Sequence, residues 1–368
     1  MGKIKLELVN LHKEYGDLVA VKDLSLAVEE GETMALLGPS GCGKSTTLNM
    51  IVGLEAPTSG DILIDGKSVV ATPPGTRNVG LVFQDYAVFT NMTVRKNLGY
   101  GLKLRKMAPS AIGDEVRRVA DFLGLSNKLD RNPSELSASE LQRVAIGRTL
   151  VTNPEILLLD EPLSNLEADD RNRMRRELRK IQGETGQTVI YVTHDQIEAL
   201  SLAHRIAVMN LGELMQYDTA HNVYHHPGNQ FVGSFLGNPP MNFVRGVLKQ
   251  EAGRTVVEND GAQMPLPIGG SLPVQPGTEV IVGMRPETMT LASADDPAAF
   301  SADVFALEPQ GPETVLTAKL GGAMLKVVVP AGAPLSDSGT ITLAPQLELL
   351  ALFDAQSGIR LMTDGGAA

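Results

Sequence analysis

The sequence predicts an α/β domain followed by a small all-β domain, and two observations lead to this prediction. In the first part of the chain, continuously apolar runs such as 155–160 and 188–193 lie between helical patterns, as buried parallel strands do. Beyond residue 238, glycine and proline separate short runs of alternating polarity, which is typical of a small barrel. We expect the two domains to cover 1–238 and 239–368.

The composition of the whole chain excludes several classes of protein. Its 368 residues suffice for two domains with ample cores, and the formal net charge of −11 argues against a nucleic-acid-binding surface. The single cysteine, Cys42, excludes an intramolecular disulfide and fits a reducing compartment. No apolar run approaches the length of a membrane span, so we expect a cytoplasmic protein, which a partner can still hold at a membrane.

Two strands, 4–9 and 24–28, are expected at the start of the chain, and Tyr15 lies between them. An aromatic side chain at this point can stack on a purine ring, with a gain of about one to a few kcal/mol in comparable stacks. By itself Tyr15 is more typical of ordinary packing. Its assignment to a nucleotide site therefore depends on the motifs that follow.

A complete phosphate-loop motif follows a predicted strand at 34–37 and opens a predicted helix at 46–54. Its residues are Gly38, Pro39, Ser40, Gly41, Cys42, Gly43, Lys44, Ser45 and Thr46. The glycines allow a tight turn whose backbone N–H groups face a phosphate chain, and the helix dipole favours the anion. Lys44 can reach the β- and γ-phosphates, and the Ser45 hydroxyl can bind Mg²⁺. The motif therefore predicts a P-loop nucleotide-binding domain rather than a glycine-rich loop that binds nothing.

The next two strands bring another polar candidate. Residues 61–66 have the pattern of a strand that ends in an Asp-Gly hairpin signal, and residues 79–83 that of a strand ending at Gln84. The amide oxygen of a glutamine at such an end can face a metal ion or a water. Alone, Gln84 would be an ordinary polar residue, so its role depends on the rest of the set.

Helical patterns fill the middle of the chain. Residues 93–125 are amphipathic, and we expect them to be helical. Ser137 and Glu140 open a further helix with the S-x-x-E spacing of a capping box, and a well-capped helix is the plain interpretation. Residues 169–182 form a highly charged helix, which we interpret as a solvated face.

Two adjacent carboxylates follow the buried strand at 155–160. Functional groups gather at the carboxyl ends of parallel strands, and paired acids there suit a metal ligand and a general base. Asp160 can hold Mg²⁺, directly or through water, while Glu161 can orient and deprotonate an attacking water. The alternative, a solvated strand end, is weak once a phosphate loop is present.

Histidines occur at two places that invite a functional interpretation. His194 follows the second buried strand, where it can contact a γ-phosphate, although a single histidine there is more often structural. His221, His225 and His226 have a spacing that suggests a metal site. Because no cysteine and no clustered carboxylate completes such a site, we interpret these three as a surface helix end.

Short alternating runs make up the predicted barrel, and none of them carries a catalytic constellation. They lie at 243–248, 254–258, 279–284, 313–320, 324–329 and 346–353. No internal repeat of the solenoid kind is visible. Chemistry is therefore expected in the first domain alone.

In their order and spacing, these motifs resemble those of the ATP-binding subunits of ABC transporters, and most closely the importer ATPases of the maltose and glycerol-phosphate type. The resemblance covers nearly the whole chain. It makes 38–46 the phosphate loop, Gln84 the Q-loop glutamine, Asp160 and Glu161 the Walker B acids, and His194 the switch histidine. Tyr15 falls where the family stacks an aromatic ring on adenine. The tail is similar to the family's regulatory OB-type domain through 238–243 and 284–287.

The resemblance also implies a mechanism, cofactors and partners. The α/β domain would include a helical subdomain, and ATP and Mg²⁺ would bind with Ser45, Gln84 and Asp160 near the metal. Two ATPase domains would close head to tail over two ATP molecules, and each site would join one phosphate loop to the other chain's signature loop, here with Ser137. Two membrane permease subunits, docked on the segment from Gln84 to about Tyr100, would hold the protein peripherally at the cytoplasmic face of the inner membrane. A solute-binding protein would take part indirectly, in uptake of a carbohydrate, a polyol or a glycerol-like solute.

Two departures from the family pattern concern the face that this chain offers to a partner. The signature L-S-G-G-Q is here Leu136-Ser137-Ala138-Ser139-Glu140, and the D-loop S-x-L-D is Ser164-Asn165-Leu166-Glu167. Without the glycines, a backbone approaches a phosphate less easily. The added carboxylate, roughly 6 Å from another charge, costs about 1 to 3 kcal/mol. We therefore expect a heterodimer, in which a second, different ATPase chain has an intact signature and one ATP site is degenerate. Glycerol and polyol importers can pair chains in this way.

Alternatives to this interpretation remain open from sequence. A soluble ABC-type ATPase of translation or DNA repair usually carries two fused ATPase domains or a long coiled-coil insertion, and this chain resembles neither. A regulatory subunit that binds ATP but hardly hydrolyses it is disfavoured by Glu161 and His194. The alternative to the heterodimer is that Ala138 and Ser139 are tolerated, and that Glu140 caps its helix as glutamine does.

Overall fold

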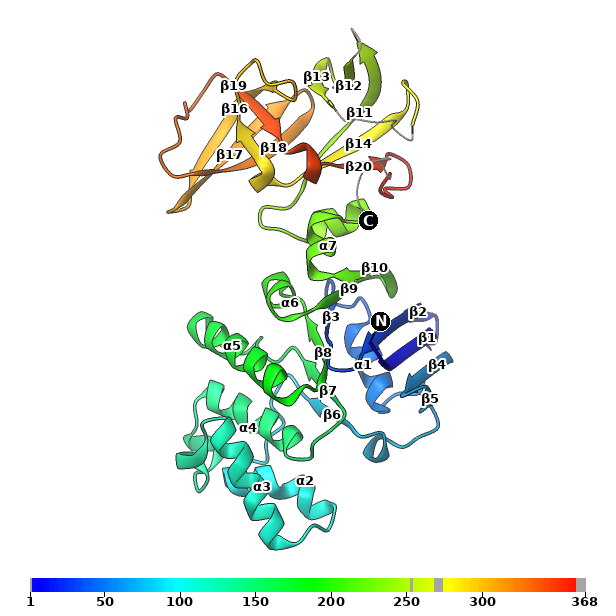
Figure 1. Ribbon diagram of the computed structural model, residues 1–368, viewed down its shortest axis with the longest axis vertical. Helices are drawn as coiled ribbons and strands as arrows, with labels where there is room; N and C mark the ends of the chain where they lie inside the picture. The colour runs from blue at the N-terminus through cyan, green and yellow to red at the C-terminus, as the bar shows by residue number, and fades with distance from the viewer. Residues whose placement is uncertain (1, 252–253, 268–273, 362–368) are drawn as a thin grey trace. The chain divides into compact units, whose positions relative to one another are not determined.

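Two structural units, Met1–Ala220 and His221–Ala368, make up the chain in the computed structural model, which describes residues 2–251, 254–267 and 274–361 (Figure 1). The first unit combines two sheets with helices. The second unit consists mainly of strands. Each unit has hydrophobic clusters of its own.

A six-stranded sheet forms the centre of the first unit, with the strand order β10-β9-β3-β8-β7-β6. The strands are β3 (Thr33–Leu37), β6 (Val79–Val82), β7 (Ile156–Asp160), β8 (Thr188–Thr193), β9 (Arg205–Asn210) and β10 (Glu213–Thr219). All neighbours pair in parallel except β9 and β10. Both faces of the sheet are buried, because Leu157 and Leu159 join one hydrophobic cluster while Ile156 and Leu158 join another. This double burial explains why the strands are continuously apolar in sequence.

A smaller antiparallel sheet packs on one side, in the order β2-β1-β4-β5. Its strands are β1 (Ile4–Tyr15), β2 (Leu18–Glu29), β4 (Ser59–Ile64) and β5 (Lys67–Ser68). Leu48 of helix α1 (Lys44–Val52) shares a buried cluster with Leu6 of β1, so this helix lies in the core between the two sheets. Asp65 and Gly66 have positive φ, 48° and 72°, as both central residues of a type I′ hairpin turn do. The Asp-Gly hairpin signal is thus confirmed.

The remaining helices of the first unit are α2 (Val94–Leu104), α3 (Pro109–Phe122), α4 (Ala138–Leu150), α5 (Ala168–Thr185) and α6 (Gln196–Leu202). Figure 1 shows α2, α3 and α4 grouped below the sheet. A helical segment that runs through 93–125 is wrong, because Lys106 has a φ of 57° and Pro109 begins a new helix. A proline lacks the N–H of a helix interior but fits this first position.

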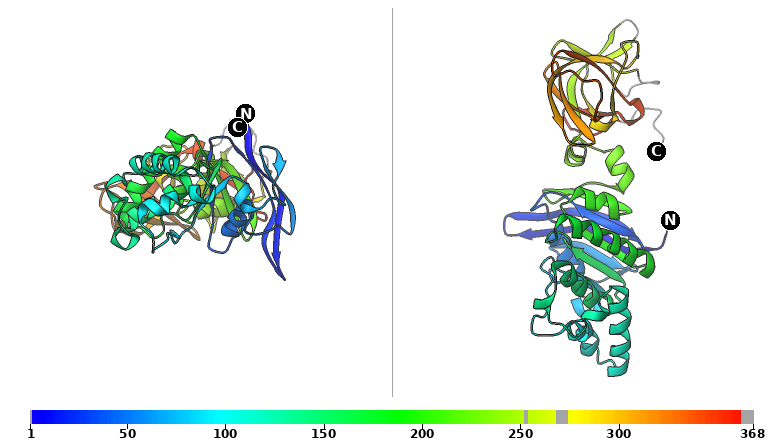
Figure 2. Two further views of the ribbon diagram at one scale, coloured as in Figure 1. Left: turned by 90° about the horizontal axis from the view of Figure 1, so that it is seen from below. Right: turned by 90° about the vertical axis from the view of Figure 1, so that its left-hand side faces the viewer.

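The second unit begins with two short helices, α7 (Ala220–His225) and α8 (Gln230–Phe235), and continues as two five-stranded antiparallel sheets. One sheet holds β11 (Asn242–Glu251), β12 (Arg254–Asn259), β13 (Ala262–Pro265), β14 (Glu279–Met284) and β20 (Ala351–Asp354). The other holds β15 (Met289–Leu291), β16 (Phe300–Pro309), β17 (Glu313–Leu320), β18 (Ala323–Pro330) and β19 (Thr340–Pro345). Their strands curve around a common interior (Figure 2, right). The single strand expected at 346–353 is wrong, because a 3₁₀ turn at Leu347–Leu349 precedes β20.

Arg285 ties the two short helices to the strands of the second unit. The residue is only 1% exposed, and its guanidinium donates to the carbonyl oxygens of Tyr224, Gly233 and Leu236. These carbonyls lie near the ends of α7 and α8, where a helix leaves its last acceptors unpaired. The run 284–287 therefore has a structural role in this unit, because its Arg285 connects the two short helices to the strands.

Candidate active site

The phosphate loop connects β3 to α1, and the packing around it requires its glycines. A Cβ atom on Gly38 would lie 2.3 Å from the carbonyl oxygen of Met209, and one on Gly43 would lie 2.4 Å from that of Ala20. Gly41 and Gly43 also have positive φ, 78° and 101°, which only glycine adopts at little cost. The loop is thus fixed between β9 and β2.

Lys44 points into the phosphate loop rather than into solvent. Its ammonium donates to the carbonyl oxygens of Gly38, at 2.8 Å, and Pro39, at 2.9 Å, and the residue is 5% exposed. The exposed residues at the loop surface are Ser40, Gly41 and Ser45, while Thr46 is half-buried. A buried cation below exposed polar residues can bind an anion such as a polyphosphate, because hydrogen bonds between charged groups are stronger than those between neutral groups.

Asp160, at the end of β7, has an unsatisfied carboxylate. Its Oδ1 is buried and has no hydrogen-bond partner among the described residues. Burial raises the pKa of this carboxyl, the neighbouring charge of Glu161 adds to the rise, and a hydrogen bond with Ser45 opposes it. An unpaired carboxylate oxygen close to a serine hydroxyl is the oxygen donor set that Mg²⁺ prefers. The residues present therefore fit a magnesium ion.

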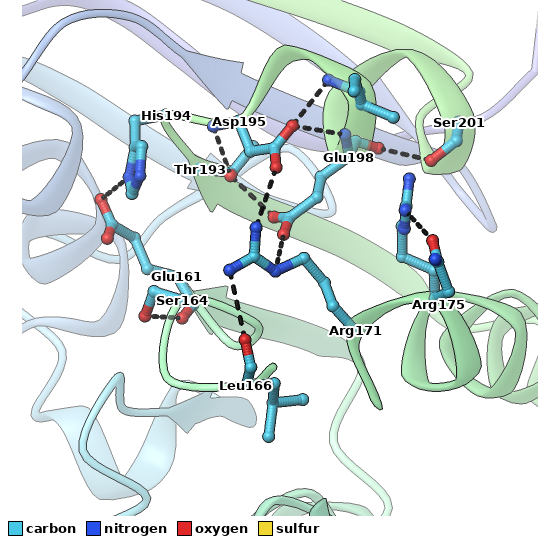
Figure 3. A network of polar contacts seen from close by, with 12 residues as sticks. Glu161, Ser164, Leu166, Arg171, Arg175, Thr193, His194, Asp195, Glu198 and Ser201 are labelled. Atoms are coloured by element: carbon cyan, nitrogen blue, oxygen red, sulfur yellow. Dashed lines mark hydrogen bonds and ion pairs between the residues drawn. The ribbon is translucent and has the colours of Figure 1, made fainter. Parts of the chain in front are cut away.

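Glu161, directly after β7, faces His194, directly after β8 (Figure 3). Its Oε1 is 3.1 Å from Nδ1 of His194, and its Oε2 accepts from Nε2 of Gln84 at 3.2 Å. These residues follow β7, β8 and β6, which are neighbours in the sheet. The structure thus brings together Glu161, His194 and Gln84, which are far apart in the sequence. No described hydrogen bond uses Oε1 of Gln84, so this oxygen remains for a metal ion or a water.

Two residues of the D-loop, to which the sequence assigned no contact with Glu161 or Gln84, complete this cluster. Ser164 donates to the carbonyl oxygen of Glu161 at 2.9 Å and also accepts from the Gln84 amide at 3.3 Å. Asn165 donates to the carbonyl oxygen of Gln84 at 2.9 Å. The signal in sequence was the D-loop pattern at 164–167, which follows the carboxylates after Pro162 and Leu163. Its meaning depends on how the turn folds back on β6.

Tyr15 lies at the end of β1, in the hairpin whose second strand packs on the phosphate loop at Ala20. Its side chain is 44% exposed, and the ammonium of Lys13 is 4.8 Å from the ring centroid. One face of the ring therefore has a cation and the residue remains open to solvent. A flat ligand can stack on such a ring.

Ser137 caps α4, and no contact among the described residues joins it to the phosphate loop of its own chain. Its hydroxyl accepts from the N–H of Glu140 at 3.3 Å and lies 3.2 Å from that of Ser139. In return, the Glu140 carboxylate accepts from the N–H of Ser137 at 3.0 Å and pairs with Lys128 at 3.1 Å. The capping box expected from the S-x-x-E spacing is therefore confirmed.

The rings of three histidines, in α7 and directly after it, lie near one another with tilted planes. The ring centroids of His221 and His225 are 4.5 Å apart, and those of His221 and His226 are 6.1 Å apart. Burial lowers the pKa of His225, and the two neighbouring histidines add to this effect. Neutral rings can pack in this way, so packing accounts for the cluster.

Comparisons with known proteins agree with this geometry. Residues 21–164 match the family described as ABC transporter, and residues 237–289 match the MalK OB fold domain. The chain is 42% identical to the sn-glycerol-3-phosphate import ATP-binding protein UgpC of Jannaschia sp. over 344 residues, or 93% of this chain and 95% of that protein. It is 47% identical to the trehalose/maltose import ATP-binding protein MalK of Thermococcus litoralis over 292 residues, or 77% of this chain and 78% of that protein.

A solved structure supports the same assignment. A dimeric ATP-binding cassette in a post-hydrolysis state, bound to ADP and phosphate, has a TM-score of 0.53 at 30% identity and covers 58% of this chain and 98% of its own. The predicted fold, an α/β P-loop domain followed by an OB-type domain, is confirmed. Within the part of the chain that the structure describes, no helix is long and apolar enough to cross a membrane. The chain therefore belongs to the ABC transporter ATP-binding proteins, as an import ATPase that carries an OB-fold domain of the MalK type.

Proposed function

We propose that ATP is hydrolysed at the edge of the six-stranded sheet, with Glu161 as the general base. The observation behind this proposal is the contact of Glu161 with both His194, at 3.1 Å, and Gln84, at 3.2 Å. A general base needs a fixed position, and here two hydrogen-bonding groups from neighbouring strands fix both carboxylate oxygens. The phosphate loop lies at the end of β3, which pairs with β8, the strand before His194.

Binding of the nucleotide uses the loop and the hairpin beside it. Backbone N–H groups from Gly41 to Thr46 would contact the phosphates, as at other helix N-termini with glycine loops. The ammonium of Lys44 would exchange its two carbonyl acceptors for β- and γ-phosphate oxygens, which are stronger acceptors because they are charged. Tyr15 would stack on the adenine with its exposed ring.

Hydrolysis then requires one proton transfer from water. Glu161 would take the proton from a water that attacks the γ-phosphorus, and the bond to the β-phosphate oxygen would break, so that ADP leaves with that electron pair. Nδ1 of His194 lies 3.1 Å from the carboxylate, and a proton on this nitrogen would donate to Glu161 and orient it. The side chain is 60% exposed, so the rest of the ring is left to contact the γ-phosphate.

The residues that would hold Mg²⁺ are Ser45, Gln84 and Asp160. A bound magnesium ion supplies charge neutralisation between the β- and γ-phosphates. For Asp160, a cation would also remove the cost of a buried carboxylate oxygen with no partner.

We further propose that this ATPase serves the uptake of a carbohydrate, a polyol or a glycerol-like solute. The names of the relatives, for glycerol phosphate and for trehalose or maltose, support this class. The chain would sit at the cytoplasmic face of the membrane on two permease subunits, with a solute-binding protein acting indirectly. We expect no nucleic acid among its partners.

The surface after Gln84 suits a permease segment. A cavity of about 120 Å³ lies there, between β6, α2 and α4, and its lining includes Phe83, Tyr86, Tyr100 and Arg148. The guanidinium of Arg148 is 4.4 Å from the ring centroid of Phe89, which fixes the loop before α2. A short helix of a permease can insert an apolar side chain into such a hollow.

The partner in the ATPase dimer would be a different chain with an intact signature. The α4 N-terminus, which would offer N–H groups to the partner's nucleotide, already holds the chain's own Glu140 carboxylate, which accepts from the Ser137 N–H and pairs with Lys128. The Ser137 hydroxyl is likewise engaged, by Glu140 and Ser139. A triphosphate at that face would meet a negative charge, so the site completed by this α4 would be the weak one.

Replacing Glu161 by glutamine tests the catalytic proposal. Glu161→Gln keeps the size of the side chain, but it leaves one acceptor oxygen in place of two and cannot accept a proton. We expect ATP binding to persist and turnover to fall by about 10² to 10⁴ fold, measured by phosphate release and by nucleotide binding. Lys44→Ala should instead weaken nucleotide binding itself. Hydrolysis by Glu161→Gln at nearly the parent rate would remove Glu161 from the mechanism.

A further inference from the structure

Thr193 and Asp195, the residues on either side of His194, belong to one network of polar contacts (Figure 3). Before it, the Thr193 hydroxyl accepts from the N–H of Asp195 at 2.9 Å and donates to Glu198 at 2.8 Å. After it, Asp195 caps α6 by accepting from the N–H groups of Ile197, at 2.8 Å, and Glu198, at 3.2 Å. The backbone on both sides of His194 is therefore fixed to the start of α6.

The centre of this network is a buried acid, Glu198, which is 3% exposed. Its carboxylate accepts from the hydroxyls of Tyr191, at 2.9 Å, and Thr193, at 2.8 Å. Burial raises the pKa of Glu198, while these two hydrogen bonds and the charge of Arg171 lower it. A buried carboxylate with a cationic neighbour needs that neighbour, because an unpaired buried charge is costly.

Arg171 is that neighbour, and it reaches two other groups as well. From the first turn of α5, its Nε lies 3.9 Å from Glu198 and its Nη1 3.5 Å from Asp195. Its Nη2 donates to the carbonyl oxygen of Leu166 at 3.2 Å. Leu166 belongs to the turn at 164–167, whose Ser164 bonds to Glu161. One guanidinium thus joins the turn that follows Glu161 to the segment that carries His194.

We propose that Arg171 is a positioning residue for hydrolysis, which holds His194 at bonding distance from Glu161 by linking these two segments. The inference rests on the proposed function, since it assumes that His194 and Glu161 act on ATP. Arg171 donates to the Leu166 carbonyl on the turn after Glu161 and forms ion pairs with Asp195 and Glu198 at the start of α6, and a planar guanidinium is suited to bridge two such segments. Without it, each segment would keep its own fold, but the separation of His194 and Glu161 would no longer be fixed.

The test uses Arg171→Met in the transporter purified through this chain, with Arg173→Met as a matched control. Arg173 is on the same helix, and its ion pair is with Asp170, at 3.8 Å on the exposed side. We expect Arg171→Met to lower kcat about 10 to 100 fold, as a displacement of about 1 Å can, and to leave KM for ATP within about two-fold. Arg173→Met should leave both constants near the parent values.

A double variant separates positioning from mere stabilisation. If Arg171 acts through His194, Arg171→Met should change kcat by less than about two-fold once His194→Ala is present. Losses that multiply in the double variant, or equal losses for Arg171→Met and Arg173→Met, would overturn the inference while leaving the proposed function intact. Full activity of His194→Ala would overturn both. Should Arg171→Met not fold, Arg171→Lys keeps the charge but not the bridge, and kcat at the parent level in that variant would also count against the inference.

Discussion

Glu161 has a backbone conformation that few residues other than glycine adopt, with a φ of 42°. Such a conformation costs of order 1 to 3 kcal/mol and persists only where the surroundings impose it. Here the N–H of Glu161 donates to the carbonyl oxygen of Val192 at 2.9 Å, and Ser164 donates to its carbonyl oxygen. The turn after β7 and the neighbouring strand therefore hold the residue in the conformation in which its carboxylate meets His194 and Gln84.

Cys42 offers a test of which part of the phosphate loop does chemistry. The residue is 2% exposed, and burial raises the pKa of its thiol. We expect only its backbone N–H to contact a bound phosphate, so Cys42→Ala should keep ATPase activity. Alkylation should be slow at neutral pH and faster as the pH rises, because the thiolate is the nucleophile.

The adduct on Cys42 should block nucleotide binding, because a bulky group in the loop would collide with the phosphates. Bound MgATP should protect the thiol, and mass spectrometry of iodoacetamide-treated protein measures this directly. Loss of ATPase activity in Cys42→Ala would show that the thiol itself has a role.

The motif residues were predictable from sequence, and the residues that hold them were not. Gln84, Glu161 and His194 meet because the ends of neighbouring parallel strands share one edge of the sheet, which the apolar runs already indicated. Arg171 and Glu198 gave no such signal. Arg171 belongs to a charged helix that reads as a solvated face, and its partners depend on where α5 and α6 pack.

At the level of elements, the central strands were predictable because both of their faces are buried, as β7 and β8 show. The strands of the barrel were less predictable from sequence. Strand β16, Phe300–Pro309, alternates buried residues with Ser301 and Asp303; it forms a hairpin with β17, and its pairing with β19 connects distant parts of the chain. Its sequence has weak β character of its own, so tertiary pairing decides its conformation.

An ion-paired cluster joins β1, the β4–β5 turn and the start of β7. The ammonium of Lys5 lies 2.7 Å from Asp65 and also pairs with Glu155. Hydrogen bonds from Lys3 and Lys5 lower the pKa of Asp65 to about 2, from an ordinary 3.8. That shift corresponds to at most about 2.5 kcal/mol, which screening reduces to ~1 kcal/mol because the carboxylate is 33% exposed.

This contribution should depend on pH in a defined window. Because the folded-state pKa of Asp65 is below the unfolded value, its stabilisation is complete above about pH 4 and is lost as the pH falls toward about 2. Asp65→Asn keeps a residue that suits a type I′ turn. We expect it to lower the free energy of unfolding of the first unit by ~1 kcal/mol at neutral pH, and by progressively less below about pH 4.

Urea unfolding of the parent and Asp65→Asn, at neutral pH and at several values below about pH 4, measures this difference. The control is Asp114→Asn, an exposed carboxylate paired with Arg117 within α3, which should change stability by less than about 0.5 kcal/mol. A difference between Asp65→Asn and the parent that stays constant with pH would show that the turn, not the charge, is responsible.

The ATPase unit has two surfaces that would contribute to ATP sites, one with the phosphate loop and one at the start of α4. Only the first has the residues that the family pattern requires. The nucleotide face keeps Lys44, Asp160 and Glu161, and its polar groups are arranged for a ligand. The partner face at the start of α4 is capped by the chain's own Glu140. In a homodimer, each ATP site would combine the complete nucleotide-binding residues of one chain with the altered signature of the other. In a heterodimer with a partner whose signature is intact, one site would combine this chain's nucleotide-binding residues with that intact signature.

The last prediction is therefore an asymmetric assembly. A transporter purified through a tag on this chain, from detergent-solubilised membranes, should contain two permease subunits and a second ATPase chain with an ordinary L-S-G-G-Q signature. Glu161→Gln in this chain should then abolish most of the ATPase activity, because its phosphate loop meets the intact signature. The equivalent change in the partner chain should do much less, because that chain's nucleotide meets the Glu140 carboxylate, which is held at the α4 N-terminus by Ser137 and Lys128. If this chain alone assembles with its permeases, hydrolyses ATP at both sites and transports normally, the asymmetric assembly is wrong, and Glu140 acts simply as the helix cap that its spacing predicts.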